Sequence, residues 1–334
     1  MYRIDDATAA TSLPVPEAAG TEGYFTEGNP ATGTPATKVR ASWLNMIQEE
    51  IRGVVVAAGL TPGKTSYGQL LTAIQSFQRT RLKANTTFYV NASTGNDSNN
   101  GLSAGAAFAT IQRAWNVLSQ NYDLNGFVAT VNIANGSYGA LNASSGPPGS
   151  LYDGAIVFNG NTASPGSVTM TSNNVNGTVF AAGAFITIQG VTLTSTGGSN
   201  SIFAGAGGRV IFNNVIFGSS AQSHIVATGG GAVVATGPYT ISGGASNHYS
   251  TDTGGLIFVS GQTVTLSGTP SFSTAFALVR WCAVLAVTST TFSGTASGAR
   301  YSIIGNGVVT GTGGNATYLP GSTAGATASG GQYT

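Results

Sequence analysis

The chain has 334 residues, enough for one large domain or two smaller ones around a substantial apolar core. Charged residues make up only 7% of it, whereas roughly 25% is usual in soluble domains, and 49 residues are glycine. The formal net charge is +1, and the lysines and arginines form no run that could follow a phosphate backbone, so nucleic-acid binding is not expected.

Cysteine and histidine are too scarce for a disulfide framework or a zinc site. Cys282 is the only cysteine, and His224 and His248 are the only histidines. We therefore expect no metal and no cofactor, and stability that comes from packing.

The N-terminus lacks a basic start and an apolar core, and no stretch of eighteen apolar residues occurs. We expect neither a signal peptide nor membrane insertion, and synthesis in a cytoplasm.

Charge divides the chain near Ala84. Residues 1–83 hold seven acidic and eight basic residues, whereas residues 84–334 hold four aspartates, four arginines, no lysine and no glutamate. This contrast predicts two structural parts with a boundary at Ala84.

The first part combines an extended segment with two amphipathic helices. Residues 1–36 are rich in Gly, Pro, Thr and Ala without periodicity, which is typical of a segment that lies on another surface. Apolar residues at helical spacing predict helices over 39–59 and 66–77, the second with Thr65 or Ser66 as its N-cap. Such a pair is either a hairpin packed on the next domain or an oligomerisation and docking module. The apolar positions expected to serve attachment or oligomerisation are Trp43, Leu44, Ile47, Ile51, Leu70 and Ile74.

The second part contains an internal repeat. Segments starting at 185, 209, 232, 256 and 283 each show an alternating apolar strand, a short polar turn and a second alternating strand. Their spacing of 23 to 27 residues, without a helix between strands, is too short for a propeller blade and suits one coil of a parallel β-helix. The predicted fold class is therefore mainly β.

The stretch FYVNASTGNDSNNGLSAGAAFATIQRAWNVL, residues 88–118, precedes these repeats and predicts a cap. A stack of coils exposes backbone and core at its first rung, so that end must be covered. We expect a capping helix at about 108–119, with Asp97 as a turn or cap residue rather than a calcium ligand. Its apolar stripe consists of Phe108, Ile111, Trp115 and Leu118.

The entry pattern FYVN…TGNDSNNGLS…AFATIQRAW resembles that of right-handed parallel β-helix proteins, among them bacteriophage tailspikes and carbohydrate lyases. The N-terminal stretch from GNPATGTPATKVRASWLNMIQEE onward and the glycine-rich ending YLPGSTAGATASGGQY are similar to phage tail-fibre sequences. The resemblance implies a virion tail protein whose N-terminal part attaches to the tail or baseplate. Its β-helix would face a host receptor, either a surface polysaccharide or an outer-membrane protein.

The surface composition independently predicts self-association. A β-helix with eight charged residues among 251 would present a nearly neutral surface rich in Val, Ile, Phe, Ala and Thr. Pairing such surfaces in a closed homotrimer would bury them.

Catalysis is not expected, although tailspikes of this shape often cleave polysaccharide. Hydrolysis needs two carboxyl groups roughly 5 to 9.5 Å apart. Asp97 and Asp123 flank the cap, and Asp153 and Asp252 are separated by about four coils, or roughly 19 Å at the spacing of stacked strands. They are too far apart to form a catalytic pair within one chain, which leaves only a pair formed across subunits of a trimer.

One polar cluster remains as a weak catalytic candidate. His248, Tyr249 and Asp252 share one loop in SNHYSTDTGG, with Arg280 about one coil further on, and these side chains could act as acid and base in a lyase. The alternative interpretation is a locally hydrogen-bonded turn. The expected function is thus a non-enzymatic fibre or spike, and the alternative is a depolymerase, lyase or hydrolase, acting on capsule or lipopolysaccharide.

Overall fold

A computed structural model describes residues 1–173 and 176–334, which form two compact units, Met1–Thr80 and Arg81–Thr334. The division falls a few residues before the change in charge content at Ala84. Each unit is considered by itself.

The N-terminal unit contains the two helices expected from the apolar spacing. Helix α1 (Ala41–Ala57) packs against helix α2 (Gln69–Ser76) through Val55 and Ala73, both fully buried. The chain leaves α1 at Gly59, whose φ of 75° suits a residue without a Cβ. The predicted N-cap of α2 is wrong: Gly68 occupies that position and no side chain caps the helix. A short 3₁₀ turn, Pro30–Thr32, interrupts the preceding extended segment.

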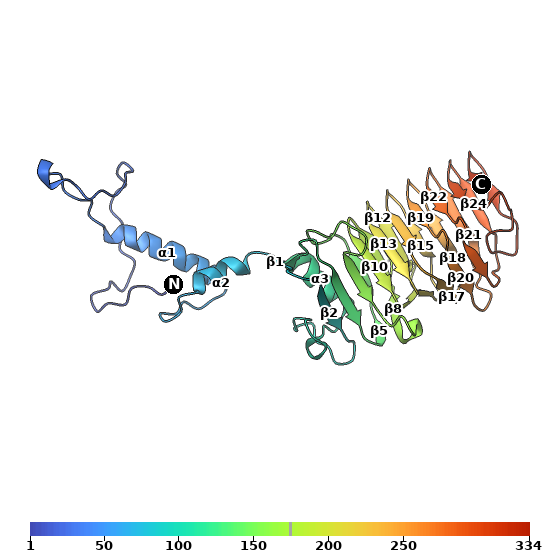
Figure 1. The fold of residues 1–334 in the computed structure, drawn as a ribbon, viewed down its shortest axis with the longest axis horizontal. Helices are drawn as coiled ribbons and strands as arrows, with labels where there is room; N and C mark the ends of the chain where they lie inside the picture. Colours follow the sequence, from blue (N-terminus) through green and yellow to red (C-terminus); the bar gives the residue numbers. More distant parts are fainter. Residues whose placement is uncertain (174–175) are drawn as a thin grey trace. The chain divides into compact units, whose positions relative to one another are not determined.

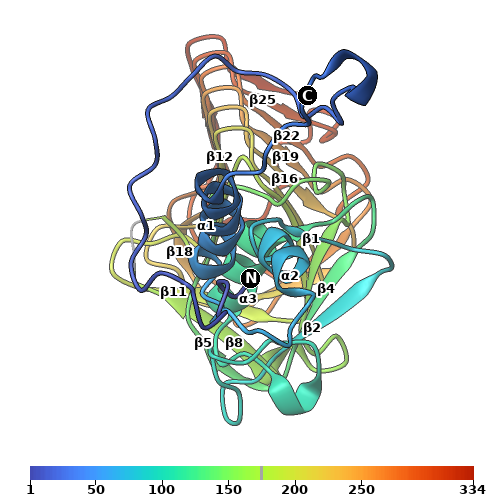
Figure 2. The ribbon, with the colours of Figure 1, turned by 90° about the vertical axis from the view of Figure 1, so that its left-hand side faces the viewer.

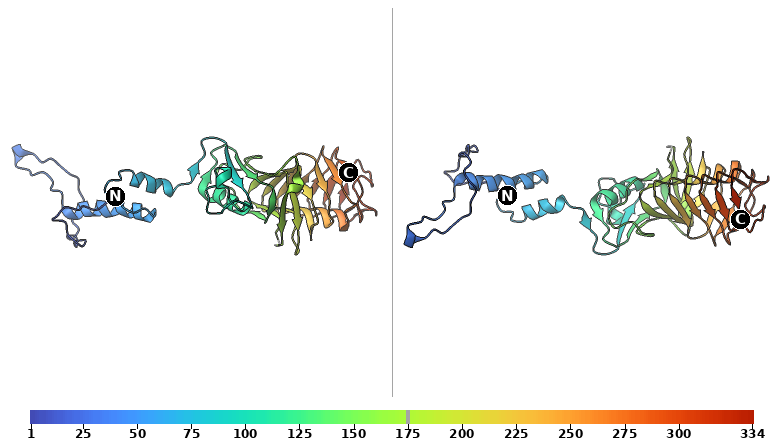
Figure 3. Two further views of the ribbon diagram at one scale, coloured as in Figure 1. Left: turned by 90° about the horizontal axis from the view of Figure 1, so that it is seen from below. Right: turned by 90° about the horizontal axis from the view of Figure 1, so that it is seen from above.

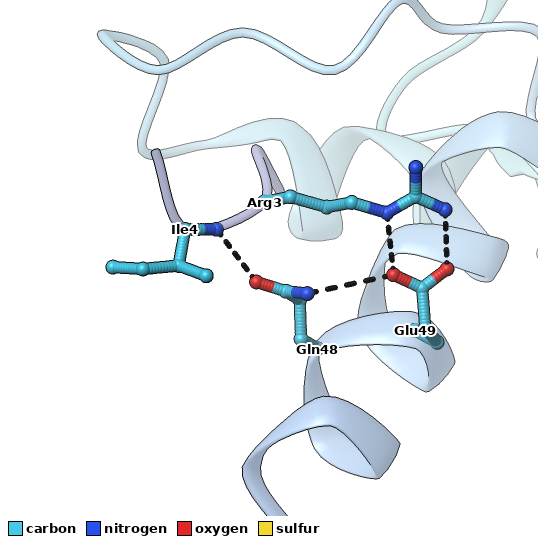
Figure 4. A network of polar contacts seen from close by, with 4 residues as sticks. All are labelled: Arg3, Ile4, Gln48 and Glu49. Atoms are coloured by element: carbon cyan, nitrogen blue, oxygen red, sulfur yellow. Dashed lines mark hydrogen bonds and ion pairs between the residues drawn. The ribbon is translucent and has the colours of Figure 1, made fainter. Parts of the chain in front are cut away.

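Polar contacts fasten the first residues of the chain to α1 (Figure 4). Arg3 donates two hydrogen bonds to the Glu49 carboxylate, from Nε at 2.6 Å and from Nη2 at 2.7 Å, and these bonds hold the pKa of Glu49 below its ordinary value. The backbone N–H of Ile4 donates to Gln48 Oε1 at 2.7 Å. Exposed ion pairs contribute little stability, so this bidentate contact mainly sets the position of the segment.

The second unit is a stack of coils built from three parallel sheets (Figure 1). Within the described residues the largest sheet has ten strands, which follow one another in chain order: β2 (Thr86–Val90), β4 (Ala129–Ile133), β7 (Ile156–Asn159), β10 (Phe185–Gln189), β13 (Arg209–Asn213), β16 (Ala232–Ala235), β19 (Leu256–Phe258), β22 (Val284–Ala286), β25 (Val308–Thr310) and β27 (Gln332–Tyr333). From β4 to β22, each coil adds one strand to this sheet and then one to each of the other two.

The other two sheets have seven and eight strands in the same part of the chain. The seven-stranded sheet comprises β5 (Gly136–Tyr138), β8 (Val168–Ser172), β11 (Thr192–Ser195), β14 (Ile216–Phe217), β17 (Tyr239–Ile241), β20 (Thr263–Leu266) and β23 (Thr291–Ser293). The eight-stranded sheet comprises β6 (Leu141–Ala143), β9 (Val179–Ala182), β12 (Ile202–Gly205), β15 (Ser223–Ala227), β18 (Ala245–Thr251), β21 (Phe272–Arg280), β24 (Tyr301–Ile304) and β26 (Ala326–Thr327). Further short elements are β1 (Thr80–Arg81), β3 (Tyr122–Asp123) and the 3₁₀ turns Ala104–Ala106 and Pro165–Ser167.

The core lies inside the coils, where equivalent apolar residues stack in register. Strand pairing is parallel throughout the described ladders, so an inward-pointing side chain in one coil lies directly above the inward-pointing side chain at the equivalent position of the preceding coil. One such column consists of Ile186, Val210, Val233, Ile257, Leu285 and Val309, each at most 2% exposed. Figure 2 looks along this stack, and Figure 3 shows the succession of coils from two further sides. The parallel β-solenoid predicted from the repeat is confirmed.

The coils that begin at β4 to β22 contain a third strand that the repeat pattern does not predict. The two strands read from each repeat correspond to the ten- and seven-stranded sheets, for example β10 and β11. The third, such as β12 or β15, follows a polar stretch of Ser, Gly, Gln or Asn, and the two-strand repeat does not include it. This omission matters because β15 and β18 carry the histidines.

Helix α3 (Ile111–Asn121) packs against the first coil, with contacts to β2, β3 and β6. It begins later than the expected 108–119, and Phe108 precedes the N-cap Thr110 and bridges to Val90. All four residues of the expected stripe are buried, and the Trp115 ring lies 6.5 Å from that of Phe158. Asp97 holds the start of the helix, since its carboxylate accepts hydrogen bonds from Ala109 N, Thr110 N and Thr110 Oγ1.

Candidate functional site

The structure corrects the position of His248 and Tyr249. The sequence predicts that both share one loop with Asp252, but they lie in β18, and neither exposes any surface. All residues of β18 from Asn247 to Thr251 are buried, although simple alternation predicts that every second side chain of a strand points outward. A polymeric substrate cannot reach side chains enclosed in this way.

His248 belongs to a chain of buried hydrogen bonds. His224 Nε2 lies 2.8 Å from the carbonyl oxygen of Gly218, His224 Nδ1 lies 3.0 Å from His248 Nδ1, and His248 Nε2 lies 3.0 Å from the Tyr239 hydroxyl. The Tyr239 hydroxyl also bonds to that of Tyr249. Because a carbonyl only accepts, His224 Nε2 must donate. With both imidazoles neutral, His248 Nδ1 then donates to His224, Tyr239 donates to His248, and Tyr249 donates to Tyr239.

Burial keeps these groups uncharged. It lowers the pKa of His224 to about 4. Burial also lowers the pKa of His248, with a further contribution from the neighbouring His224, and it raises the pKa of Tyr239 and of Tyr249. A neutral, enclosed and mutually satisfied chain stabilises one arrangement of the core, so we assign these residues a structural role.

Asp252 and Arg280, by contrast, are brought together at the surface. Arg280 Nη2 donates to Asp252 Oδ2 at 3.0 Å, and the Thr228 hydroxyl donates to Asp252 Oδ1. The guanidinium also lies over the indole of Trp281, with its Cζ 4.5 Å from the ring centroid. The Trp281 side chain is 52% exposed. This corner therefore combines an exposed aromatic ring with a charge-neutral ion pair.

The other aspartates after Ala84 have separate partners. Asp97 anchors α3, Asp123 pairs with Arg81 at 3.6 Å, and Asp153 pairs with Arg209 at 2.7 Å. In residues 1–173 and 176–334, no group of three His, Cys, Asp or Glu side chains is placed to hold a metal ion. None of the helices in those ranges is long and apolar enough to cross a membrane.

The N-terminal unit presents a second candidate, an apolar surface on the two helices. Of the positions expected to serve attachment, Leu44 is 54% exposed, Ile74 43%, Trp43 40% and Leu70 37%, whereas Ile47 and Ile51 are half-buried. A groove of about 750 Å³ lies beside this surface, between the extended segment and α1. Its lining includes Leu13, Phe25, Trp43 and Met46, together with the ion pair of Glu17 and Arg40.

Sequence reasoning missed Tyr239 and Trp281. Tyr239 looked like an ordinary strand residue, and only the third strand reveals that it meets His248. Trp281 carried a detectable signal. It occupies a turn position at which the preceding coils have Ala206, Gly229 or Thr253, so an alignment of the coils would have singled it out.

These features define the chain as a parallel β-solenoid protein with a separate N-terminal helical unit. In sequence it is 43% identical, over 81 residues, to an uncharacterised protein named StfP from Escherichia coli strain K12. The match spans 24% of this chain and 37% of that protein. No protein-family model and no solved structure matches the chain.

Proposed function

We propose that the protein is a structural subunit of a phage tail fibre or spike. Its N-terminal unit would join other copies of the chain and the tail or baseplate, and its solenoid would face the host surface receptor. The observation that carries the proposal is the apolar surface of α1 and α2, because an isolated soluble unit rarely leaves so many large side chains exposed. The solenoid fold and the resemblance of the N-terminal and C-terminal stretches to tail-fibre sequences support it.

The partner proposed for this surface is first of all a second and third copy of the chain. Spacings of three and four residues along α1 separate Leu44, Ile47, Ile51 and Val54, the pattern of a helix that packs against parallel neighbours. The few charges of the solenoid add little repulsion between copies. A homotrimer would leave the remaining apolar surface and the groove for tail or baseplate proteins.

Substitutions at exposed helical positions test the proposal without disturbing the fold of the monomer. Ile74→Lys places a charge on the apolar surface, and Gln75→Lys at the neighbouring exposed position is the matched control. We expect Ile74→Lys to abolish trimer formation and incorporation into particles, and Gln75→Lys to leave both intact. Normal incorporation of the Ile74→Lys chain would refute the assignment of this surface.

A further inference from the structure

The turns that join the eight-stranded sheet to the ten-stranded sheet form a stack along one corner of the solenoid. In six described coils both central residues of this turn have positive φ, a conformation that glycine adopts readily and that bulky side chains disfavour. The pairs in chain order are Ala206–Gly207, Gly229–Gly230, Thr253–Gly254, Trp281–Cys282, Gly305–Asn306 and Ser329–Gly330. Only the fourth of these described pairs contains an aromatic residue, with a φ of 53° at Trp281.

The neighbouring coils hold Trp281 in this conformation. Gly254 N donates to the carbonyl oxygen of Trp281 at 3.2 Å, and Cys282 N donates to that of Gly305 at 3.0 Å. Gly305 also leaves the space that the indole occupies, since a Cβ built there would lie 2.9 Å from Trp281 Cδ1. Disfavoured backbone persists only where the surroundings enforce it, and it is concentrated at functional sites.

The ring has polar groups beside it. The exposed Thr253 occupies the position equivalent to Trp281 in the turn of the preceding coil. Arg280 and Asp252 add hydrogen-bond donors and acceptors with no net charge, and both remain partly exposed, at 31% and 16%. An exposed ring beside an ion pair therefore fits a ligand that has both an apolar face and many hydroxyl groups.

We propose that Trp281, Arg280, Asp252 and Thr253, here called the Trp281 corner, form a saccharide-binding site. The apolar C–H face of a pyranose ring stacks on the indole, and its hydroxyl groups accept from the Arg280 guanidinium and donate to the Asp252 carboxylate. The guanidinium carries five N–H donors, more than its bond to Asp252 uses. This inference rests on the proposed fibre role, in which the solenoid faces the host surface.

The test applies the full-length chain to a printed array of neutral and anionic oligosaccharides, followed by fluorescence titration of those that bind. The decisive variant is Trp281→Gly, which removes the ring and supplies a residue that tolerates the positive φ. We expect binding to weaken by about tenfold or more, while the thermal midpoint stays equal or rises. Tyr67→Ala, which removes an exposed aromatic ring from the N-terminal unit, should leave saccharide binding unchanged.

Several results would overturn the inference. Saccharide binding retained by Trp281→Gly, or absence of binding across the array by the intact chain, would remove the site. A lower thermal midpoint in Trp281→Gly would show that the ring serves packing, and a changed native mass would place it between copies of the chain. Incorporation of Ile74→Lys into particles is read separately, so a failure of the fibre role is distinguished from a failure of the Trp281 corner.

Discussion

Replacement of Trp115 by alanine tests whether α3 stabilises the first coil as a cap. The side chain is 2% exposed and lies between α3 and the core near Phe158. Burying a tryptophan removes roughly 150 to 250 Å² from water, and truncations of this kind cost about 3 to 5 kcal/mol when the cavity cannot collapse. Because each coil rests mainly on its neighbours, the loss should be felt first in the early coils.

Hydrogen exchange of backbone amides measures this effect coil by coil. In Trp115→Ala we expect faster exchange in β4 (Ala129–Ile133), whereas amides in 283–292, around β22, should remain protected for longer. Trp43→Ala serves as the control, since Trp43 belongs to the other unit and is 40% exposed. Unchanged protection of β4 in Trp115→Ala would refute the cap, and equal loss of protection in both regions would refute the dependence of each coil on its neighbours.

Four further predictions follow from the two units and the buried polar groups. Native mass spectrometry should give three times the chain mass of 33.4 kDa, and a stable monomer at micromolar concentration would contradict the trimer. A chain that starts at Arg81 should keep the solenoid, since Leu82 is already part of its core, but should no longer enter particles; normal entry would exclude the N-terminal unit as the attachment module. Burial lowers the pKa of His224 from 6.5 to about 4. As the pH falls, His224 therefore binds a proton in the unfolded chain before it does so in the folded chain. Stability should therefore be complete above about pH 6.5 and fall by about 3 kcal/mol as the pH drops to about 4; urea midpoints that do not change over this range would contradict the neutral buried chain. Asp97→Ala removes three hydrogen bonds at the start of α3 and should cost about 1 to 3 kcal/mol in urea unfolding, and no change would show that the turn is held by other contacts.

The fold could be predicted from the sequence because the solenoid repeats its pattern in every coil. Alternation such as that of FITIQGVTLTS recurs at each coil, and register then follows from stacking like residues, as between Ile186 and Val210. The sequence pattern did not predict strands such as β15 and β18, because their buried positions include Ser, His and Asn. These segments therefore lack the apolar alternation that marks a strand.

The candidate sites could be predicted only in part. Asp252 and Arg280 are one coil apart, and the repeat length was sufficient to bring them together. Alternation along a strand places only one of two consecutive side chains inside, so the burial of both His248 and Tyr249 does not follow from the local pattern. The orientation of Trp281 follows from a turn conformation imposed by neighbouring coils rather than by the turn's own residues.

Electron microscopy of particles that carry a peptide tag after Thr334 tests the central claim most directly. The tag extends from the last coil of the solenoid, close to β27, and can be labelled with an antibody. The proposed role predicts label on the tail, displaced from the point of attachment, and no label on particles made with the Ile74→Lys chain. Purified particles that lack the chain, or label confined to the capsid, would contradict a role in the tail.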